Sequence, residues 1–427
     1  MEMLMQYVWE HRLLSPEELT TNDGKPIRII DPGIRNTDAG PDFFNAKIEI
    51  DGCLWAGNVE IHYRASDWFR HGHDKDAAYD SVILHVVDKD DAPVARSSGE
   101  RIPQMVMQCK PQFIEKYAQL INNKSQLPCA EIIRSMSPLE TAEWVQSLAF
   151  ERLQHKSTRI KSLLERYRGS WEDVCYVTFA RTIGFGTNSE AFELLAKSLP
   201  LTLLHKHADS LLQIEALFFG QAGLLDDRKD TSNGYFMQLC REYDFLQNKF
   251  SLRRPEGLMW KSFRMRPQNF PCRRIALLAH YVHNGFRMLA DLLEAKGDEE
   301  KLRALFNVRL EGFWSTHFSF SGEAAEPTAA LSRGSVDIIL INTVAPLYYT
   351  YAEFTDEYEW AERATTLLES LKPEKNHITE TFASAGLKID NALVSQAVVQ
   401  LRNEYCLQRK CLYCKAGHKL LSAARKK

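Results

Sequence analysis

Residues 40–63 read GPDFFNAKIEIDGCLWAGNVEIHY, and this stretch decides the fold of the N-terminal region. Two apolar runs flank Asp51-Gly52, a dipeptide typical of a tight hairpin turn. We therefore expect antiparallel strands over 43–50 and 54–63. Side chains alternate between the faces of a strand, so Glu60 and His62 share one face of the second arm. The hairpin predicts that Asp42 and Glu60 converge at one end of the sheet.

The surrounding sequence places this hairpin in an α/β domain. Helical spacing of apolar residues predicts a helix over 3–14, and β-branched runs predict strands over 27–30, 82–87 and 102–107. After about residue 111 the apolar period becomes 3.6, which is typical of helices. The helical segments expected there span 139–164, 191–204, 211–224, 235–250, 274–293 and 361–371. We predict an α/β domain over 1–120 and an all-helical domain over 121–427 that contains the C-terminal cysteines.

The polar residues of the hairpin suit a cation. Asp42, Glu60 and the Ile61 carbonyl offer the oxygen ligands that Mg²⁺ or Mn²⁺ prefers, with positions left for a phosphodiester and its attacking water. The alternative is structural: Gly40-Pro41-Asp42 is only a turn, and Glu60 and His62 lie on a solvated strand face.

A helix, a strand, Pro-Asp entering a hairpin and an acidic-x-basic triplet on the next strand together resemble the PD-(D/E)XK nuclease core. The resemblance covers roughly residues 1–110. It implies catalytic and metal-binding roles for Asp42 and Glu60, and Glu10 matches the acidic residue that some members carry on the first helix. His62 stands where the family usually has lysine. The chain is also similar to an uncharacterised bacterial family of unknown function through residues 40–43, 59–62 and 411–414.

A histidine-rich stretch follows the hairpin. His71, His73 and Asp76 lie within one short segment, and His85 lies on the next expected strand. Together with His62, they offer imidazole and carboxylate ligands for a transition metal. The alternative is a polar loop whose histidines bond to the backbone or to phosphate.

Three of the nine cysteines gather near the C-terminus. Cys406, Cys411, Cys414 and His418 have the spacing C-x4-C-x2-C-x3-H, and four such ligands satisfy tetrahedral zinc. Alternatively, the three thiols join Cys109 or Cys129 around an iron–sulfur cluster. In a third interpretation they are reduced thiols that pack between helices.

A basic segment lies within the helical region. Residues 253–274 carry seven basic side chains against one acid, with aromatic residues between them. Such a mixture suits phosphate contact and base stacking, but it equally suits arginines that pair within a packed domain. The candidate nucleic-acid-binding residues are Arg253, Arg254, Trp260, Lys261, Arg264, Arg266, Arg273 and Arg274.

Composition places the chain among globular proteins, with 44% hydrophobic and 26% charged residues and a net charge of -3. Residues 1–14 read as a helix and not as a signal peptide, and the longest apolar run, 336–352, is too short to span a membrane. We therefore expect a cytoplasmic location. Three functions remain: a metal-dependent nuclease or DNA-processing protein, a non-catalytic nucleic-acid or protein-binding scaffold, and a hydrolase built on His62, His71 and His73.

Overall fold

The computed structural model describes residues 1–14, 19–123, 127–227, 233–323 and 330–422. The chain divides into two compact units. The first contains residues 1–137, 384–387 and 402–427, and the second contains residues 138–383 and 388–401. An N-terminal mixed sheet followed by a mostly helical remainder confirms the predicted fold class at this level.

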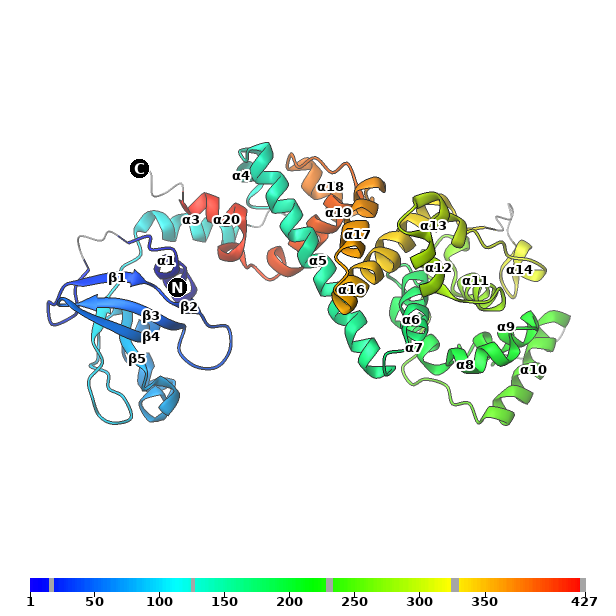
Figure 1. Ribbon diagram of the computed structural model, residues 1–427, viewed down its shortest axis with the longest axis horizontal. Helices are drawn as coiled ribbons and strands as arrows, with labels where there is room; N and C mark the ends of the chain where they lie inside the picture. The colour runs from blue at the N-terminus through cyan, green and yellow to red at the C-terminus, as the bar shows by residue number, and fades with distance from the viewer. Residues whose placement is uncertain (15–18, 124–126, 228–232, 324–329, 423–427) are drawn as a thin grey trace. The chain divides into compact units, whose positions relative to one another are not determined.

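The first unit is built on a mixed sheet (Figure 1). Its main strands have the order β1-β3-β4-β5-β6, and β2 pairs with β3. β1, β3 and β4 pair in antiparallel fashion, whereas β5 runs parallel to β4 and β6 runs parallel to β5. The strands are β1 (Ile27–Asp31), β2 (Ile34–Arg35), β3 (Phe43–Ile50), β4 (Cys53–Arg64), β5 (Val82–Lys89) and β6 (Gln104–Val106). The predicted hairpin and its flanking strands are confirmed.

The alternation along β4 separates an apolar face from a polar one. Val59 and Ile61 enter a core shared with Leu4, Met5 and Val8 of helix α1 (Glu2–Glu10). Glu60 and His62 point to the other face, where Glu60 lies beside His85 of β5 in the strand register. This second face is covered by the short helix α2 (Asp67–Arg70) and the 3-10 turns η2 (His73–Lys75) and η3 (Ala77–Tyr79).

Gly57 allows β4 and β5 to approach each other closely. A Cβ atom at this position would lie 2.4 Å from Cγ2 of Ile83 and 2.8 Å from the carbonyl oxygen of Ser81. Only glycine avoids this overlap. The register of β4 and β5 is irregular directly after this point, between Asn58 and Val59, where the polar residues of β4 begin.

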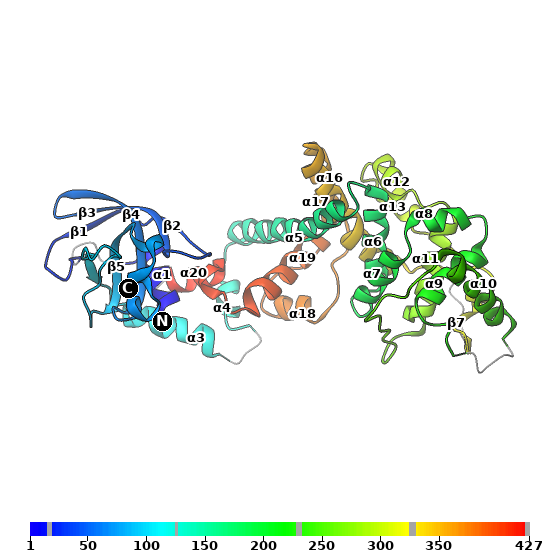
Figure 2. The ribbon, with the colours of Figure 1, turned by 90° about the horizontal axis from the view of Figure 1, so that it is seen from below.

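The C-terminal segment belongs to the first unit, which differs from the predicted boundary at residue 120. Leu412 and Leu421 lie in the same core as α1 and the sheet, so burial of apolar surface holds this segment there. Helix α20 (Lys415–Ser422) lies beside α3 (Pro111–Asn122), as both ribbon views show (Figures 1 and 2). The unit also contains α4 (Ala130–Arg134) and the turn η8 (Cys411–Tyr413).

The second unit is mostly helical, as the apolar period predicts. The expected segment 191–204 is divided because Pro200 has no amide proton and begins a new helix. Its helices are α5 (Pro138–Arg166), α6 (Trp171–Ile183), α7 (Ser189–Ser198), α8 (Leu201–Leu204), α9 (Leu211–Gln221), α10 (Gly234–Phe250), α11 (Pro271–His283), α12 (Met288–Ala295), α13 (Glu299–Leu305), α14 (Phe313–Thr316), α15 (Arg333–Ile339), α16 (Ala345–Thr355), α17 (Glu359–Ser370), α18 (His377–Ser384) and α19 (Ala392–Gln400).

Two features of the helical region were not predicted. A small antiparallel pair, β7 (His317–Ser319) and β8 (Gly322–Glu323), interrupts the helices. In addition, π-helical turns over Leu340–Val344 and Leu401–Cys406 interrupt the regular helical period. Among the described helices, none combines the length and the apolar character that crossing a membrane requires.

Candidate functional site

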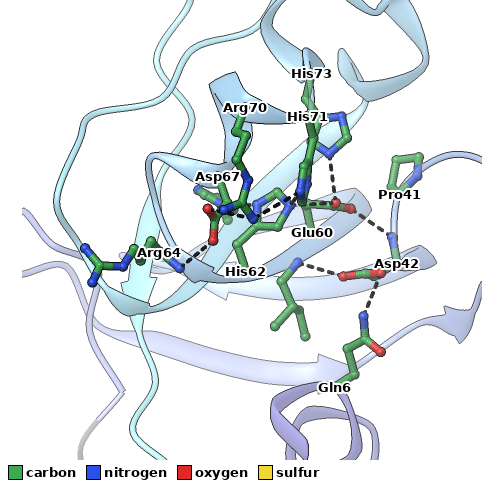
Figure 3. Close-up of polar contacts among 12 residues, drawn as sticks. Gln6, Pro41, Asp42, Glu60, His62, Arg64, Asp67, Arg70, His71 and His73 are labelled. Atoms are coloured by element: carbon green, nitrogen blue, oxygen red, sulfur yellow. Dashed lines mark hydrogen bonds and ion pairs between the residues drawn. The ribbon is translucent and has the colours of Figure 1, made fainter. Parts of the chain in front are cut away.

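Asp42 and Glu60 lie together at one end of the hairpin. The backbone N–H of Asp42 donates to Oε2 of Glu60 at 3.0 Å, and the N–H of Ile61 donates to Oδ2 of Asp42 at 3.0 Å. Gln6 of α1 donates from Nε2 to Oδ1 of Asp42 at 2.8 Å (Figure 3). Each contact fixes the direction of a carboxylate, so this corner of the sheet is tightly ordered.

Three histidines cluster beside this carboxyl pair, and two of them contact Glu60. His62, His71 and His73 each offer a ring nitrogen, and these atoms all lie within 4.8 Å of one another. Nε2 of His73 lies 3.3 Å from Oε1 of Glu60, and Nε2 of His62 lies 3.4 Å from the same oxygen. Nε2 of His62 is also 3.1 Å from Nδ1 of His71. The tertiary structure thus merges two clusters that were separate in the sequence (Figure 3).

Aromatic packing holds the imidazoles in place. The ring of His73 stacks on Tyr79, with centroids 3.7 Å apart, and Trp68 packs edge-on against His73 at 5.4 Å. Behind His62, Nε2 of His85 lies 2.9 Å from Nδ1 of His62. A second imidazole that contacts the far nitrogen of a metal-ligating histidine fixes its tautomer and orientation.

The cluster is open on the side of His71. His71 is exposed, whereas His62 and His73 are buried. The side chain of Arg70 is 69% exposed, and its Nη2 lies 3.4 Å from Nε2 of His71. Arg70 also pairs with Asp67 at 3.0 Å. A guanidinium therefore stands at the solvent side of the site, where it can meet an anionic substrate.

Burial keeps the imidazoles of His62, His71 and His85 neutral. It lowers the pKa of His62 to about 2 and that of His85 to about 3, and the positive charge of neighbouring histidines adds to the effect. The pKa of His71 is lowered for the same reasons. Neutral imidazole is the form that can bind a metal, so His62 and His71 are already in that state at neutral pH.

The carboxyl pair is shifted in the opposite direction. Burial, followed by the charge of Glu60, raises the pKa of Asp42 to about 7. The pKa of Glu60 is also raised by burial, and its contact with His73 opposes that rise. A cation placed between these groups would relieve the repulsion and lower both pKa values.

The raised pKa of Asp42 predicts a pH-dependent stability of the metal-free protein. Between about pH 4 and about pH 7 folded Asp42 retains a proton that the unfolded chain has lost, so its contribution to stability falls as pH rises. Asp42→Asn, which cannot ionise, should therefore gain stability relative to wild type as pH rises through this window. Urea unfolding with a chelator, at about pH 5 and about pH 8, measures the difference.

Asp38→Asn is the control for this prediction, because Asp38 is exposed in the same loop. Its stability relative to wild type should be the same at both pH values. Equal pH profiles for wild type and Asp42→Asn would show that Asp42 titrates normally.

Two other candidate residues lie outside the cluster. Glu10, at the C-terminal end of α1, pairs with Arg35 at 3.7 Å. The acidic residue of α1 whose negative charge acts on Asp42 and Glu60 is instead Glu2. Glu2 lies about two helical turns before Glu10, at the other end of the helix. Asp76 caps the turn η3 by accepting from the N–H of Ala78 at 2.9 Å. Its carboxylate therefore has a structural role.

The C-terminal candidates separate into two groups. Nδ1 of His418 lies 2.7 Å from the hydroxyl of Tyr7, and its Nε2 lies 3.1 Å from the hydroxyl of Ser422. Both ring nitrogens are thus engaged away from the thiols. Cys406, Cys411 and Cys414 line a common cavity, in which the fourth cysteine is Cys129.

Much of the basic segment serves the packing of the helical unit. Arg273 donates to the carbonyl oxygens of Trp314 and His317, Arg274 donates to Asn269, and Arg254 pairs with Asp226. Nε1 of Trp260 donates to the carbonyl oxygen of Ala222 at 2.8 Å. Arg264 stacks on the exposed ring of Phe263, and the exposed basic side chains of the segment are Arg253, Arg254, Lys261, Arg264 and Arg266.

Sequence reasoning missed the residues that support the cluster. Gln6, Trp68 and Arg70 come from helices, and nothing in the linear pattern links them to the hairpin. The signal that was available is the tryptophan itself, placed between the hairpin and the histidines. A large aromatic residue beside polar ligands is typical of a walled site.

The family of the chain follows from a comparison with known proteins. A family model described as Protein of unknown function (DUF2851) matches residues 2–377. The chain belongs to this family. The match covers the sheet, the histidine cluster and most of the helical unit of this DUF2851 protein, and it ends before the C-terminal cysteines. No curated protein and no solved structure matches the DUF2851 chain.

Proposed function

We propose that the first unit is a metal-dependent hydrolase that cleaves phosphodiesters, with nucleic acid as the substrate class. The observation that carries the proposal is the cluster of His62, His71 and His73, in which His62 and His73 also contact the carboxylate of Glu60. Three imidazoles and one carboxylate suit a transition metal such as Zn²⁺ or Mn²⁺ better than Mg²⁺. A bound ion of this kind supplies a hydroxide nucleophile at neutral pH.

The residues of the chain divide the remaining tasks. His62, His73 and Glu60 hold the ion from the buried side, and His71 completes the set from the solvent side. His85 positions His62 through the 2.9 Å contact to Nδ1. Asp42, which Gln6 and the N–H of Ile61 hold beside Glu60, is placed to accept a proton from the attacking water.

Two features favour a phosphodiester over other substrates. Arg70 places a permanent positive charge at the open side of the cluster, and guanidinium pairs well with phosphate oxygens. The order α1-β1-β3-β4-α2-β5 also agrees with the order that the PD-(D/E)XK resemblance implies. In this proposal His62, at the lysine position of that pattern, acts as a metal ligand.

Metal analysis and a substrate panel test the proposal. The full chain is stripped with a chelator, reloaded with Zn²⁺, Mn²⁺ or Mg²⁺, and assayed on a phosphodiester, a phosphomonoester, DNA and RNA. We expect about one equivalent of Zn²⁺ or Mn²⁺ per chain and cleavage of the phosphodiester, with recovery only after reloading. Metal binding without cleavage of any substrate would favour a non-catalytic binding scaffold. Absence of metal binding would rule out the proposed hydrolase.

A further inference from the structure

A second cluster of metal-ligating side chains lies at a cavity of about 330 Å³ in the first unit, outside the histidine site. Four of its lining residues are cysteines: Cys129, Cys406, Cys411 and Cys414. All nine cysteines of the chain are thiols. Four of the nine thiols line one cavity, although they come from two distant parts of the sequence. Such clustering indicates a shared ligand more than ordinary packing.

Electrostatics show that the four thiols act on one another. Burial raises the pKa of Cys129 to about 12, and negative charge on Cys414, Cys406 or Cys411 raises it further. Burial also raises the pKa of Cys406 to about 12, with contributions from Cys414 and Cys411. Without a cation these thiols therefore stay protonated, and a bound metal or cluster would lower their pKa values and bind them as thiolates.

The lining of the cavity favours a negatively charged metal–thiolate group. Burial raises the pKa of both Cys406 and Cys411, and Arg402 and Arg409 oppose that rise because each guanidinium stabilises the nearby thiolate. The described residues that line the cavity include no aspartate or glutamate. The rest of the wall is largely apolar, with Leu120, Ile121, Leu127 and Leu407. An apolar wall restricts the access of water to such a group.

The spacing of the sulfur atoms separates a single ion from a cluster. Four thiolates around one Zn²⁺, at about 2.3 Å each, lie roughly 3.8 Å from one another. Among the described residues, no three cysteine sulfurs lie mutually within 4.8 Å. In an iron–sulfur cube each thiolate binds a different iron atom, so the sulfurs lie further apart. Four thiols around one cavity without such a close trio therefore suit a cluster better than a single zinc ion.

The local backbone is built for close packing around these residues. A Cβ atom at Gly417 would lie 1.9 Å from the carbonyl oxygen of Cys411, so glycine lets α20 pack directly on the turn that carries Cys411. Cys414 immediately precedes α20, whose N-terminal amides favour a negatively charged ligand. Cys129 immediately precedes α4.

We infer that Cys129, Cys406, Cys411 and Cys414 bind a [4Fe–4S] cluster in this cavity. His418, which the sequence offered as a fourth ligand, is replaced in this role by Cys129. The cluster joins the segment after α3 to the C-terminal segment, which are far apart in the sequence and lie in the same unit. The inference is independent of the proposed hydrolase, because the two sites share no residue.

The test is anaerobic purification of the full chain, with iron, acid-labile sulfide and zinc measured together. We expect about four iron and four sulfide per chain, with visible absorption that bleaches on reduction. Sulfide separates the cluster from any iron bound by the histidines. One equivalent of zinc without sulfide would overturn the inference, and so would a chain that stays free of sulfide after incubation with ferrous iron and sulfide.

Substitutions then assign the ligands. Cys129→Ser, Cys406→Ser, Cys411→Ser and Cys414→Ser should each lower bound sulfide at least about tenfold. Cys109→Ser is the matched control, because Cys109 is a buried cysteine of the same unit that does not line the cavity, and it should retain the cluster. Full sulfide content in Cys129→Ser would exclude Cys129 as a ligand and overturn the four-cysteine assignment. The wild-type measurement does not depend on the folding of any variant.

Discussion

Glu60→Gln and His73→Ala are expected to abolish metal binding at the histidine cluster, and with it hydrolysis. Oε1 of Glu60 lies 3.3 Å from His73 and 3.4 Å from His62, so either change removes a ligand from the centre of the set. Loss of residues that merely support a metal ligand costs about 10–100-fold in affinity. Loss of a ligand should therefore cost at least about 100-fold. Isothermal titration of stripped protein with Zn²⁺ or Mn²⁺ measures the affinity.

Glu49→Gln is the matched control for this prediction. Glu49 is a carboxylate of the same sheet, on β3, where it pairs with Arg28 away from the cluster. Its variant should bind metal and hydrolyse substrate as wild type does. If Glu60→Gln and His73→Ala keep full metal affinity while Glu49→Gln also does, the ion binds elsewhere in the chain. Circular dichroism of each variant separates loss of a ligand from loss of the fold.

Trp68→Ala is expected to give the largest loss of stability in the first unit. Trp68 is fully buried, packs against His73, Tyr79 and His85, and donates from Nε1 to the carbonyl oxygen of Ala95 at 3.1 Å. Truncation of a buried tryptophan leaves a cavity and costs about 3–5 kcal/mol. It also frees the imidazoles to turn, so metal affinity should fall together with stability. Chemical unfolding followed by circular dichroism measures the free energy.

Trp55→Ala provides the comparison, because Trp55 lies on β4 of the same sheet and is 39% exposed. Its loss should cost clearly less than that of Trp68, since an exposed side chain leaves no cavity. Trp68→Phe keeps most of the volume and should lie between the two alanine variants. Equal losses in the free energy of unfolding for Trp55→Ala and Trp68→Ala would contradict the prediction. They would mean that the packing of Trp68 behind the histidines adds no stability.

The elements of the fold were predictable from local sequence. The Asp51-Gly52 turn with its flanking alternation predicted β3 and β4, and the change from period 2 to period 3.6 predicted the mostly helical remainder. These signals are local, because side-chain alternation and turn chemistry act over a few residues. The pairing of Asp42 with Glu60 followed from the same hairpin.

The extent of the units could not be read in this way. Leu412 and Leu421 return to the core of α1 and the sheet, although the helical period of the C-terminal segment resembles that of the second unit. A periodic pattern predicts that one face of a helix is buried. It does not predict which other element covers that face, because any apolar surface nearby can bury it.

The sequence by itself determined the kinds of residues at each site: carboxylates and imidazoles in and directly after the hairpin, and thiols near the C-terminus. Only the tertiary structure decided which of them meet. It merged Asp42 and Glu60 with His62, His71 and His73, and it exchanged His418 for Cys129 at the cysteine cavity. The physical reason is that a metal site needs ligand atoms within a few ångströms of one point, and only packing between distant segments sets those distances.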